Sequence, residues 1–379
     1  MRICSPQCGI APETTSGGET YERELLTRLG RDGIEIDLIL AKGKPYPPNI
    51  PNWTVHRFPI RKGLRWPVAP LIVPQAIKRV YDRRPFDLLR VHALRHMGPS
   101  VLWARRRYGL DVPIVAHHHH LDASPWNRLI DKRVIEAADH VITVSEFSKR
   151  QLETELGVRT DHVSVIHDGV DERFVPGQRD EVLARSLGIG PGPVALTLGG
   201  LKPRKNLEGL IELWWEVHQH IPTATLVIAG DGPLRDRLRF VVKALALEGS
   251  VVFTGRVHEM NKVAIYQLAD VFVSTSWMEG FGLTVAEAMS CGLPVVVSTR
   301  GALPEVVGSS TGATLCDPDH PQGFVQALIG RLTYPERSRG DGRANRTRIE
   351  SRFRWDRTAQ AVRWVYEEAV ARWQKDKAA

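Results

Sequence analysis

Short hydrophobic runs alternate with segments of helical periodicity along almost the whole chain. Runs rich in Val and Ile predict strands, whereas apolar residues three and four apart, as in 21–29, predict amphipathic helices. The first seven expected strands lie in RICSP, IEIDLIL, TVHRFPI, FDLLRVHA, PIVAHHH, HVITVS and VSVIHDG. Five more lie in PVALTLGG, TLVIAGDG, VVFTGRV, VFVSTS and PVVVS. This alternation predicts parallel sheets built from strand–helix units.

A turn-rich segment, DGVDERFVPGQRD, interrupts the alternation near residues 170–180. Because 379 residues are many for one core, we predict two domains, residues 1–171 and 172–357. Each is expected to be an α/β domain with a doubly wound, Rossmann-like sheet. Residues 358–379 have the pattern of an amphipathic helix, and packing back onto the first domain would complete that domain.

The composition excludes several classes of protein. With 42% hydrophobic and 25% charged residues, the chain is expected to be globular rather than disordered or fibrous. It has no apolar run of the roughly 20 residues that a membrane helix needs, and no apolar segment of a signal peptide at its start. Four scattered cysteines predict neither a disulfide scaffold nor a zinc site. These features favour a reducing cytoplasm.

Basic residues are concentrated in one stretch. Residues 57–107 contain 13 Lys or Arg and only two acidic residues, a net charge of +11. The stretch also contains Trp66 and the cluster Leu71, Ile72 and Val73, a mixture that suits the headgroup region of an anionic membrane. Peripheral contact with the inner face of the membrane and a merely solvated face both stay open. No nucleic-acid motif accompanies the stretch, so a nucleic-acid partner is not expected.

Two loops between a strand and a helix are suited to phosphate. The first expected strand is followed by TTSGG, in which Gly17 and Gly18 let a ligand approach the free N–H groups of a helix N-terminus. It is not a GxGxxG motif, which disfavours a nicotinamide cofactor. In the second domain, the loop LKPRK brings Lys202, Arg204 and Lys205 to a helix N-terminus, where a diphosphate could bind. A solvated basic turn is the alternative for this loop.

The most informative segment is WMEGFGLTVAEAMSCGLPVVVS. A loop containing Glu279 follows an expected strand, and the carboxyl ends of parallel strands are where open α/β sheets bind ligands. Glu287 belongs to the next helix, expected to begin near Thr284. A purely structural interpretation exists for Glu287, because Thr284-x-x-Glu287 has the form of a capping box.

Taken together and in order, these motifs resemble the retaining glycosyltransferases of family four, which have the GT-B fold. The most specific match is EGFGLTVAE followed by AMSCGLPVV, with seven residues between the two glutamates. The other matching segments are GGETYERELLTRL, VITVSEFSKRQL, VIHDGVDERFVP, LGGLKPRKNL, IAGDGPLRDRL, GALPEVV and FRWDRTAQAVRWVYEEA. The resemblance covers nearly the whole chain and implies that the two Rossmann-like domains face each other across a cleft.

The resemblance implies roles for residues at matching positions. Lys205 would bind the donor diphosphate and stabilise the departing charge, Glu279 would lie near the donor sugar, and Glu287 would bind the ribose hydroxyls. The expected catalytic residues are Lys205, Glu279 and His119. The expected donor-binding residues are Gly17, Gly18, Lys202, Arg204, Lys205, Glu279, Gly280, Phe281, Gly282, Leu283 and Glu287.

One position departs from the family pattern. Where the family usually has an arginine, this chain has Gly200. Lys202 or Arg204 could supply the missing charge; if neither does, stabilisation of the leaving group is weaker.

The histidine run 117–120 ends an expected strand. Neighbouring strand side chains face opposite sides, so only alternate histidines can converge. His119 matches the family histidine that lines the donor sugar, and His117 would share its face; for the other histidines we favour a place in the core. Asp122 and Glu146 are further candidates for contact with the acceptor.

The sequence therefore predicts a metal-independent, retaining glycosyltransferase. It would move a hexose from UDP, GDP or ADP to a hydroxyl acceptor, with lipid-linked and glycan acceptors as the leading classes, and it would need no cofactor. A nucleotide-sugar 2-epimerase of the same fold is the alternative enzyme. A catalytically weak donor-binding protein is a third hypothesis, motivated by Gly200.

Overall fold

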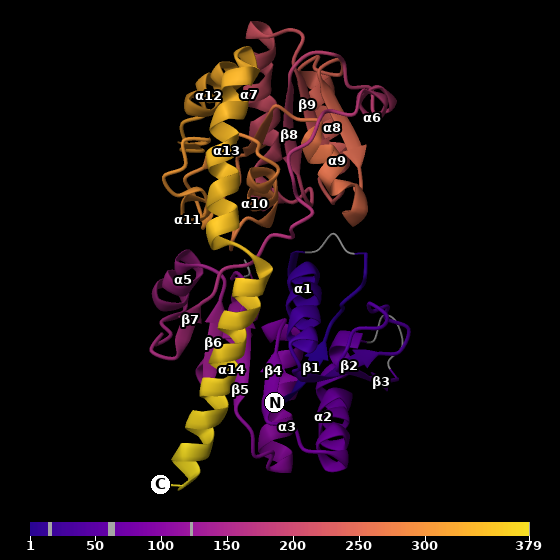
Figure 1. Cartoon of the computed structure of the whole chain (residues 1–379), viewed down its shortest axis with the longest axis vertical. Helices are drawn as coiled ribbons and strands as arrows, with labels where there is room; N and C mark the ends of the chain where they lie inside the picture. Colours follow the sequence, from indigo (N-terminus) through magenta and orange to yellow (C-terminus); the bar gives the residue numbers. More distant parts are fainter. Residues whose placement is uncertain (14–16, 60–64, 122–123, 379) are drawn as a thin grey trace. The chain divides into compact units, whose positions relative to one another are not determined.

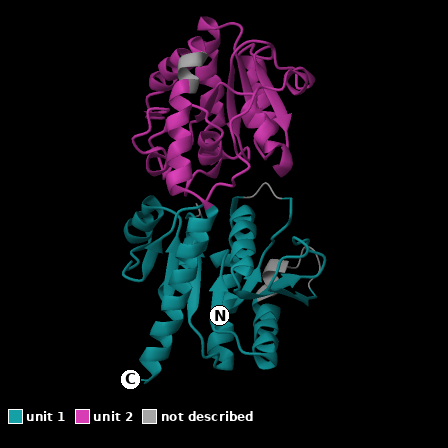
Figure 2. Ribbon diagram, in the orientation of Figure 1, with its two compact units in different colours: residues 1–168, 355–379 teal, residues 169–354 magenta. Residues whose placement is uncertain are grey.

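The chain forms two compact units. The computed structural model of its 379 residues describes residues 1–13, 17–59, 65–121 and 124–378, without the side chains of 65–69 and 335–339. Unit 1 contains residues 1–168 and 355–379, and unit 2 contains residues 169–354 (Figure 2). The chain therefore leaves unit 1 after Asp168 and returns to it at Trp355. The sequence-based boundaries were 171/172 and 357/358.

Unit 1 is built on a parallel sheet. Within its described part, seven strands are arranged in the order β3-β2-β1-β4-β5-β6-β7 (Figure 1). The strands are β1 (Arg2–Gln7), β2 (Glu35–Ala41), β3 (Trp53–Phe58), β4 (Leu88–Val91), β5 (Ile114–His118), β6 (His140–Thr143) and β7 (Val163–Val165). Because β1 lies between β2 and β4, successive crossovers leave β1 in opposite directions. Ligands bind open α/β sheets at the carboxyl side of such a switch point.

Helices cover both faces of the unit 1 sheet. They are α1 (Gly17–Arg31), α2 (Arg65–Arg83), α3 (Leu94–Tyr108), α4 (Pro125–Ala137), α5 (Glu146–Leu156) and α14 (Trp355–Ala378). The helix α1 packs against α14, whereas α2 packs against α3 and α3 against α4. Right-handed crossovers require this division, since α1 connects strands in one direction and α2 to α5 connect them in the other.

Unit 2 repeats the same architecture. Its sheet has the order β10-β9-β8-β11-β12-β13, with β8 at the switch point. The strands are β8 (Val194–Leu198), β9 (Thr225–Ala229), β10 (Val251–Gly255), β11 (Val271–Ser274), β12 (Val295–Ser298) and β13 (Ala313–Cys316). All pair in parallel. The edge strand β13 was not among the strands that the sequence pattern predicts.

The helices of unit 2 also form two layers. They are α6 (Glu181–Ser186), α7 (Leu207–His220), α8 (Arg235–Ala244), α9 (Lys262–Gln267), α10 (Leu283–Ser290), α11 (Leu303–Val307), α12 (Gln322–Thr333) and α13 (Pro335–Arg352), with 3₁₀ turns η1 (Pro203–Lys205) and η2 (Glu259–Asn261). The helix α7 packs against α8 and α12, and α10 packs against α11 and α13. The prediction of two doubly wound, Rossmann-like parallel sheets is thus confirmed.

The C-terminal helix α14 belongs to unit 1, as its amphipathic pattern suggested. Val362 and Val365 are buried, together with Tyr366, while the intervening Arg363 and Trp364 are exposed. The helix begins at Trp355, whose ring lies 5.8 Å from that of Tyr21 in α1. Burial of this face is what attaches the final segment of the chain to a sheet formed by its first half.

Candidate active site

Two loops at the carboxyl edge of the unit 2 sheet bring the predicted charged residues together. One loop follows β8 and contains η1; the other follows β11 and contains Glu279. The backbone N–H of Trp277 donates to the carbonyl of Arg204 over 2.9 Å, and the Thr275 hydroxyl donates to the carbonyl of Asn206 over 2.9 Å. These bonds fix the cationic loop against the acidic one.

The carboxylate of Glu279 is buried between two cations. Its Oε1 lies 2.6 Å from Lys205 Nζ, and its Oε2 lies 2.6 Å from an Arg204 guanidinium nitrogen. Arg204 also donates to the carbonyl of Met278, and Ser276 donates to Oε1 over 2.9 Å. Burial alone would raise the pKa of Glu279, but Lys205 and Arg204 outweigh it and lower this pKa to about 2. One anion therefore faces two cations, which leaves the cluster with a net positive charge.

Glycines allow the backbone segments beneath this cluster to pack closely against each other. A Cβ on Gly230 would lie 1.9 Å from the carbonyl oxygen of Gly199, so the loops after β8 and β9 touch backbone to backbone. A Cβ on Gly199 would lie 3.5 Å from Lys205 Nζ, which places the ammonium group over this backbone. Lys202 extends along Gly200, with its Cε 3.6 Å from where a Gly200 Cβ would be. The side chain of Lys202 has no hydrogen bond or ion pair with any described residue.

The segment 280–283 follows Glu279 and leads into α10. Gly282 adopts φ +104°, a conformation that favours glycine, and the helix begins at the next residue, Leu283. Phe281 is buried, and its ring packs 5.5 Å from that of Phe353. The backbone of Gly280 and Phe281 is therefore anchored by a buried side chain, while the side chain itself points into the unit.

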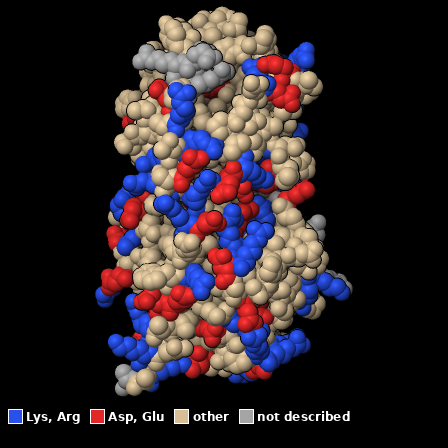
Figure 3. Space-filling view, viewed as in Figure 1, with Lys and Arg blue, Asp and Glu red and all other residues tan. Residues whose placement is uncertain are grey.

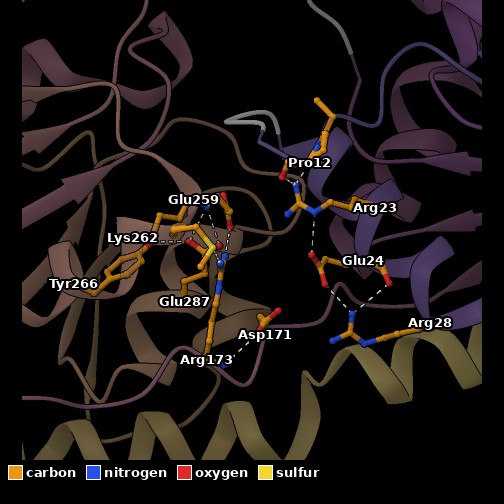
Figure 4. Close-up of polar contacts among 12 residues, drawn as sticks. Pro12, Arg23, Glu24, Arg28, Asp171, Arg173, Glu259, Lys262, Tyr266 and Glu287 are labelled. Atoms are coloured by element: carbon orange, nitrogen blue, oxygen red, sulfur yellow. Dashed lines mark hydrogen bonds and ion pairs between the residues drawn. The ribbon is translucent and has the colours of Figure 1, made fainter. Parts of the chain in front are cut away.

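Glu287 lies in a buried cluster of charged groups, shown in Figure 4. Tyr266 donates to its Oε2 over 2.7 Å, and Lys262 Nζ lies 3.2 Å from its Oε1. Lys262 also pairs with Glu259 at 3.1 Å, and Glu259 pairs in turn with Arg173. Burial lowers the pKa of Lys262, but the two carboxylates outweigh it and raise this pKa above its ordinary value.

The capping-box interpretation of Glu287 is wrong. The N-cap residue of α10 is Gly282, so Thr284 lies inside the helix and cannot be the cap. The carboxylate of Glu287 instead accepts hydrogen bonds from Lys262 and Tyr266, which belong to α9. These two partners were missed by the sequence analysis. Nothing in their local pattern indicates them, because the contact depends on how α9 packs beside α10.

In unit 1, the carboxyl edge of the sheet gathers glycines and histidines at the start of α1. The helix begins at Gly17, and a Cβ on Gly18 would lie 3.6 Å from the ring of His92. His92 Nε2 lies 3.0 Å from His119 Nε2, and the His119 ring lies edge-on to Tyr21 at 4.5 Å. Burial lowers the pKa of both histidines, which favours their neutral forms.

His92 is a second residue that the sequence analysis missed. It follows β4 directly, as His119 follows β5, and the two strands are neighbours. That shared position at the carboxyl edge was the available signal. Glu146 is the exposed first residue of α5, and Asp122 lies outside the described residues.

A buried polar network supports this edge from below. Glu22 of α1 and Arg90 of β4 form a fully buried ion pair, and Gln7 donates to Glu22 over 2.5 Å. Arg90 Nε donates to the Tyr366 hydroxyl over 2.7 Å, and that hydroxyl lies 2.7 Å from His117 Nε2. His117 is thus held in the core between tyrosines, with its Nδ1 3.0 Å from the Tyr21 hydroxyl.

Fewer basic residues of the stretch 57–107 are available for contact with a membrane than its sequence suggests. Arg90 is fully buried, and Lys78, Arg84 and Arg105 form ion pairs with Asp82, Glu35 and Asp139. On the face of the molecule in Figure 3, basic and acidic side chains are interspersed.

The apolar cluster within this stretch is also mostly buried. Val73 lies in the core and Ile72 packs against it, so of this cluster only Leu71 is exposed, which contradicts insertion of all three. Arg61 and Lys62 lie outside the described residues, as do the side chains of Arg65 and Trp66.

The cysteines, possible metal ligands and long helices of the described residues add no further candidate site. All four cysteines are within the described ranges and are free thiols. No group of three His, Cys, Asp or Glu residues in the described part could hold a metal ion. None of the described helices is both long and apolar enough to cross a bilayer.

Two family models match successive parts of the chain. Glycosyltransferase Family 4 matches residues 15–174, and Glycosyl transferases group 1 matches residues 180–347. D-inositol 3-phosphate glycosyltransferase of Acidothermus cellulolyticus is 29% identical to this chain over 97% of it and 88% of the relative. A GDP-mannose-dependent phosphatidylinositol monomannoside mannosyltransferase of Mycolicibacterium smegmatis is 29% identical over 68% of this chain and 70% of its own length.

Solved structures share the fold. Sucrose-phosphate synthase of Thermosynechococcus elongatus superposes with a TM-score of 0.81 at 22% identity, covering 98% of this chain and 99% of that one. HepE of Anabaena in complex with UDP-glucose has a TM-score of 0.78 at 20% identity, covering 97% and 100%. At these identities the likeness shows the architecture.

Proposed function

Because the chain belongs to the family-four glycosyltransferases of the GT-B fold, we propose that it moves a hexose from a nucleotide-sugar to a hydroxyl acceptor with retention of configuration and without a metal ion. The observation that carries the proposal is the pairing of Lys205 and Arg204 with the buried Glu279 at the carboxyl edge of the unit 2 sheet. The donor-bound structure of HepE, which shares the fold, supports a nucleotide-sugar as the donor class.

The cluster is suited to a leaving group whose charge grows. As the bond between the sugar C1 and the diphosphate breaks, negative charge accumulates on the diphosphate, a bond to the acceptor oxygen forms on the same face of the sugar, and the proton of the acceptor hydroxyl passes to the departing diphosphate. Lys205 and Arg204 together carry one more charge than Glu279 neutralises. In a site largely withdrawn from water, this excess charge stabilises the departing diphosphate more than it would in solvent. That role needs no divalent cation, which is the basis for proposing metal independence.

Glu279 has a second use in this arrangement. With its pKa near 2, it is ionised throughout the physiological range and holds the two cations in place before the donor arrives. Its location beside Lys205 also suits contact with the hydroxyls of the donor sugar, as the family resemblance implies. Glu287, fixed by Tyr266 and Lys262, is the proposed acceptor of hydrogen bonds from the ribose hydroxyls.

Lys202 is the proposed replacement for the arginine that Gly200 lacks. Arg204 is committed to Glu279 and the Met278 carbonyl, whereas Lys202 extends over Gly200 and has no partner among the described residues. This favours turnover over mere donor binding. A Gly200→Arg, Lys202→Ala double variant should recover the kcat that Lys202→Ala loses; failure to recover would leave the weak donor-binding hypothesis in force.

The acceptor class is proposed from the relatives and from surface charge. The named relatives transfer sugars to an inositol phosphate and to a phosphatidylinositol mannoside, which supports a hydroxyl acceptor that is lipid-linked or part of a glycan. Peripheral contact with an anionic membrane is proposed for the basic residues that stay exposed on α2 and α3, which are Arg79, Arg83, Arg106 and Arg107. They lie at the C-terminal ends of two packed helices, away from the carboxyl edge of the sheet.

The test is a screen of UDP-, GDP- and ADP-hexoses for thermal stabilisation, followed by product analysis with the best donor in the presence of a chelator. We expect one nucleotide class to stabilise the chain, and NMR of the released or transferred sugar to show the donor anomer. Loss of turnover on chelation would refute metal independence, and an inverted anomer would refute retention. Conversion of the donor into its 2-epimer without acceptor would establish the isomerase instead.

A further inference from the structure

A cavity lies in unit 1 beneath the C-terminal half of α14, remote from the candidate active site. It has a volume of about 520 Å³ and is lined by α14, the start of β6 and the middle of β7. His140 and Asp139 mark the amino end of β6, whereas His92 and His119 lie at the carboxyl edge of the same sheet. In Figure 1, α14 passes over these strands. The volume is within the range of ligand pockets, roughly 300–1,000 Å³.

Two tryptophans from α14 line this cavity, and they differ in which of their groups a ligand could contact. Trp364 is 61% exposed, and no aromatic or cationic group of the described residues lies against its ring. Trp373 is covered by the cations of Arg105 and Lys377, at 5.7 and 5.4 Å from the ring centroid. Its indole Nε1–H is buried and has no hydrogen-bond acceptor. One indole face is therefore open for stacking, and one buried donor lacks an acceptor.

Charged side chains complete the lining without pairing to each other. The side chains of Glu368, Arg372 and Asp376 form no hydrogen bond or ion pair with any described residue. On the opposite wall, His140 is bonded to the Ser164 hydroxyl at 2.9 Å, and burial, with Arg372 and His162, lowers the pKa of His140 to about 4. The cavity thus offers free carboxylates, a free guanidinium and an indole N–H to whatever enters.

This mixture discriminates among ligand classes. An anion would meet the free carboxylates of Glu368 and Asp376, and a cation would meet Arg372. An acyl chain would bury all three charged groups without compensation. A neutral polyol suits the lining, because each hydroxyl can donate to a carboxylate and accept from Arg372 or from the Trp373 N–H. The apolar C–H face of a sugar ring can also stack on an exposed indole.

We propose that this cavity is an accessory carbohydrate-binding site, which holds one or two neutral sugar rings of a glycan by stacking on Trp364 and hydrogen bonding to Glu368, Arg372 and Trp373. The site goes beyond the proposed transfer reaction and uses none of its residues. Its place at the amino edge of the sheet would let the protein retain a glycan while the carboxyl edge serves the reaction.

The test is direct binding of neutral trisaccharides, namely maltotriose, cellotriose and α-mannotriose, to the full chain, measured by saturation-transfer NMR and calorimetry. We expect at least one probe to bind, Trp364→Ala and Glu368→Gln each to weaken its affinity at least about tenfold, and the shift of the Trp373 indole N–H signal to disappear in both. Trp126→Ala is the matched control, because Trp126 is 77% exposed on α4 and does not line the cavity.

The binding must also be independent of the transfer reaction. Lys205→Ala should bind the trisaccharide as the unmodified chain does, so a failure of the proposed function would not disturb this result. The proposal is overturned if no trisaccharide binds, if Trp364→Ala and Trp126→Ala weaken binding equally, or if inorganic phosphate displaces the sugar. Both substituted side chains contribute to an accessible surface, and unchanged circular dichroism of each variant excludes misfolding as the cause.

Discussion

At the scale of single residues, the site in unit 2 depends on charges that neutralise one another incompletely. Glu279 is buried with two cations, and Lys262 is buried with two carboxylates. Each central group would be costly to bury alone, since an isolated charge in a protein interior loses its hydration. The first cluster keeps an excess positive charge, whereas in the second the two carboxylates are balanced by Lys262 and by Arg173, which pairs with Glu259. This difference suits the first to a diphosphate and the second to hydroxyl groups.

Lys205→Ala tests the first cluster. We expect kcat to fall about 100- to 1,000-fold, because a contact to the developing charge on the leaving group is lost, while the fold stays intact. Steady-state kinetics with the donor identified in the screen measures the change. Lys243→Ala, which removes an exposed lysine on α8, is the control and should keep the wild-type kcat. An unchanged kcat in Lys205→Ala would exclude the assigned role.

Glu279→Gln tests the pH dependence of stability. Because the pKa of Glu279 is lowered to about 2 in the folded chain, its contribution to the free energy of unfolding is complete above pH 4.5 and is lost as pH falls toward 2. The variant should lose up to about 3 kcal/mol at neutral pH and little at pH 2. Urea unfolding across this range measures it. A constant difference between the two proteins at all pH values would contradict the assignment.

Tyr266→Phe tests the orientation of Glu287. The substitution removes the hydrogen bond of 2.7 Å to Oε2 and leaves Lys262 in place. We expect a several-fold higher KM for the donor with a kcat close to wild type, and a stability loss of about 1 kcal/mol. Tyr334→Phe, at an exposed position, serves as the control. A loss of stability without any change in KM would mean that the cluster serves the fold alone.

Sequence reasoning at this scale found the loops but not all the partners. Lys205 and Glu279 were recognisable because each follows a strand in a glycine-rich loop, which a local pattern records. Lys262 and His92 were not, because each reaches its partner through packing between elements far apart in the chain. The N-cap of α10 is Gly282, two residues before Thr284, and this difference was enough to make Glu287 look like the partner in a capping box.

At the scale of elements, most strands were predictable because they are buried on both faces and consist of continuous Val- and Ile-rich runs. The strand β13 is an exception. Its four residues, ATLC, include an exposed leucine, and they pair only with β12 at the edge of the sheet. A short edge strand has little hydrophobic signal of its own, and its conformation is imposed by the neighbouring strand.

The packing of α14 on unit 1 is stabilised by the buried hydroxyl of Tyr366, which accepts a hydrogen bond from Arg90. Tyr366→Phe removes the acceptor of Arg90 Nε and leaves this donor buried and unpaired, which should cost about 1–3 kcal/mol of unfolding free energy. Denaturant unfolding measures the loss. Glu367→Gln removes an exposed pair with Arg363 on the same helix and should cost under about 0.5 kcal/mol. Equal losses in the two variants would show that the buried hydrogen bond is unimportant.

At the scale of the whole molecule, the net charge of +8 does not translate directly into a basic surface, because some basic side chains are buried or paired and others are exposed. The fully buried Arg90 cannot attract an anionic partner such as a membrane. The arginines that are paired with carboxylates attract such a partner only weakly. The exposed set Arg79, Arg83, Arg106 and Arg107 is what remains of the stretch on α2 and α3 in the described side chains. The net charge counted along the sequence overstated the positive charge available on the surface, because the burial and pairing of side chains are decided only when the chain folds.

Vesicle co-sedimentation tests that exposed set. Binding to anionic vesicles should exceed binding to neutral ones and should weaken as salt screens charges beyond about 8–10 Å. Reversing all four arginines to Glu should reduce binding further without changing donor hydrolysis. The control reverses Arg235, Arg237, Arg239 and Lys243 on α8, an equal change in net charge. Equal effects of the two reversals, or no preference for anionic lipid, would refute a specific membrane face.

The return of the chain to unit 1 at Trp355 also bears on how the protein is made. Unit 2 is one continuous segment, so all of it has been synthesised before synthesis of α14 begins. Unit 1 starts first but finishes last, because Arg90 obtains its acceptor from a tyrosine 276 residues further along. The common order, in which the N-terminal domain folds to completion first, is therefore not open to unit 1, which lacks α14 until the end of synthesis. A released chain truncated before residue 355 would contain the whole second unit and an incomplete first one.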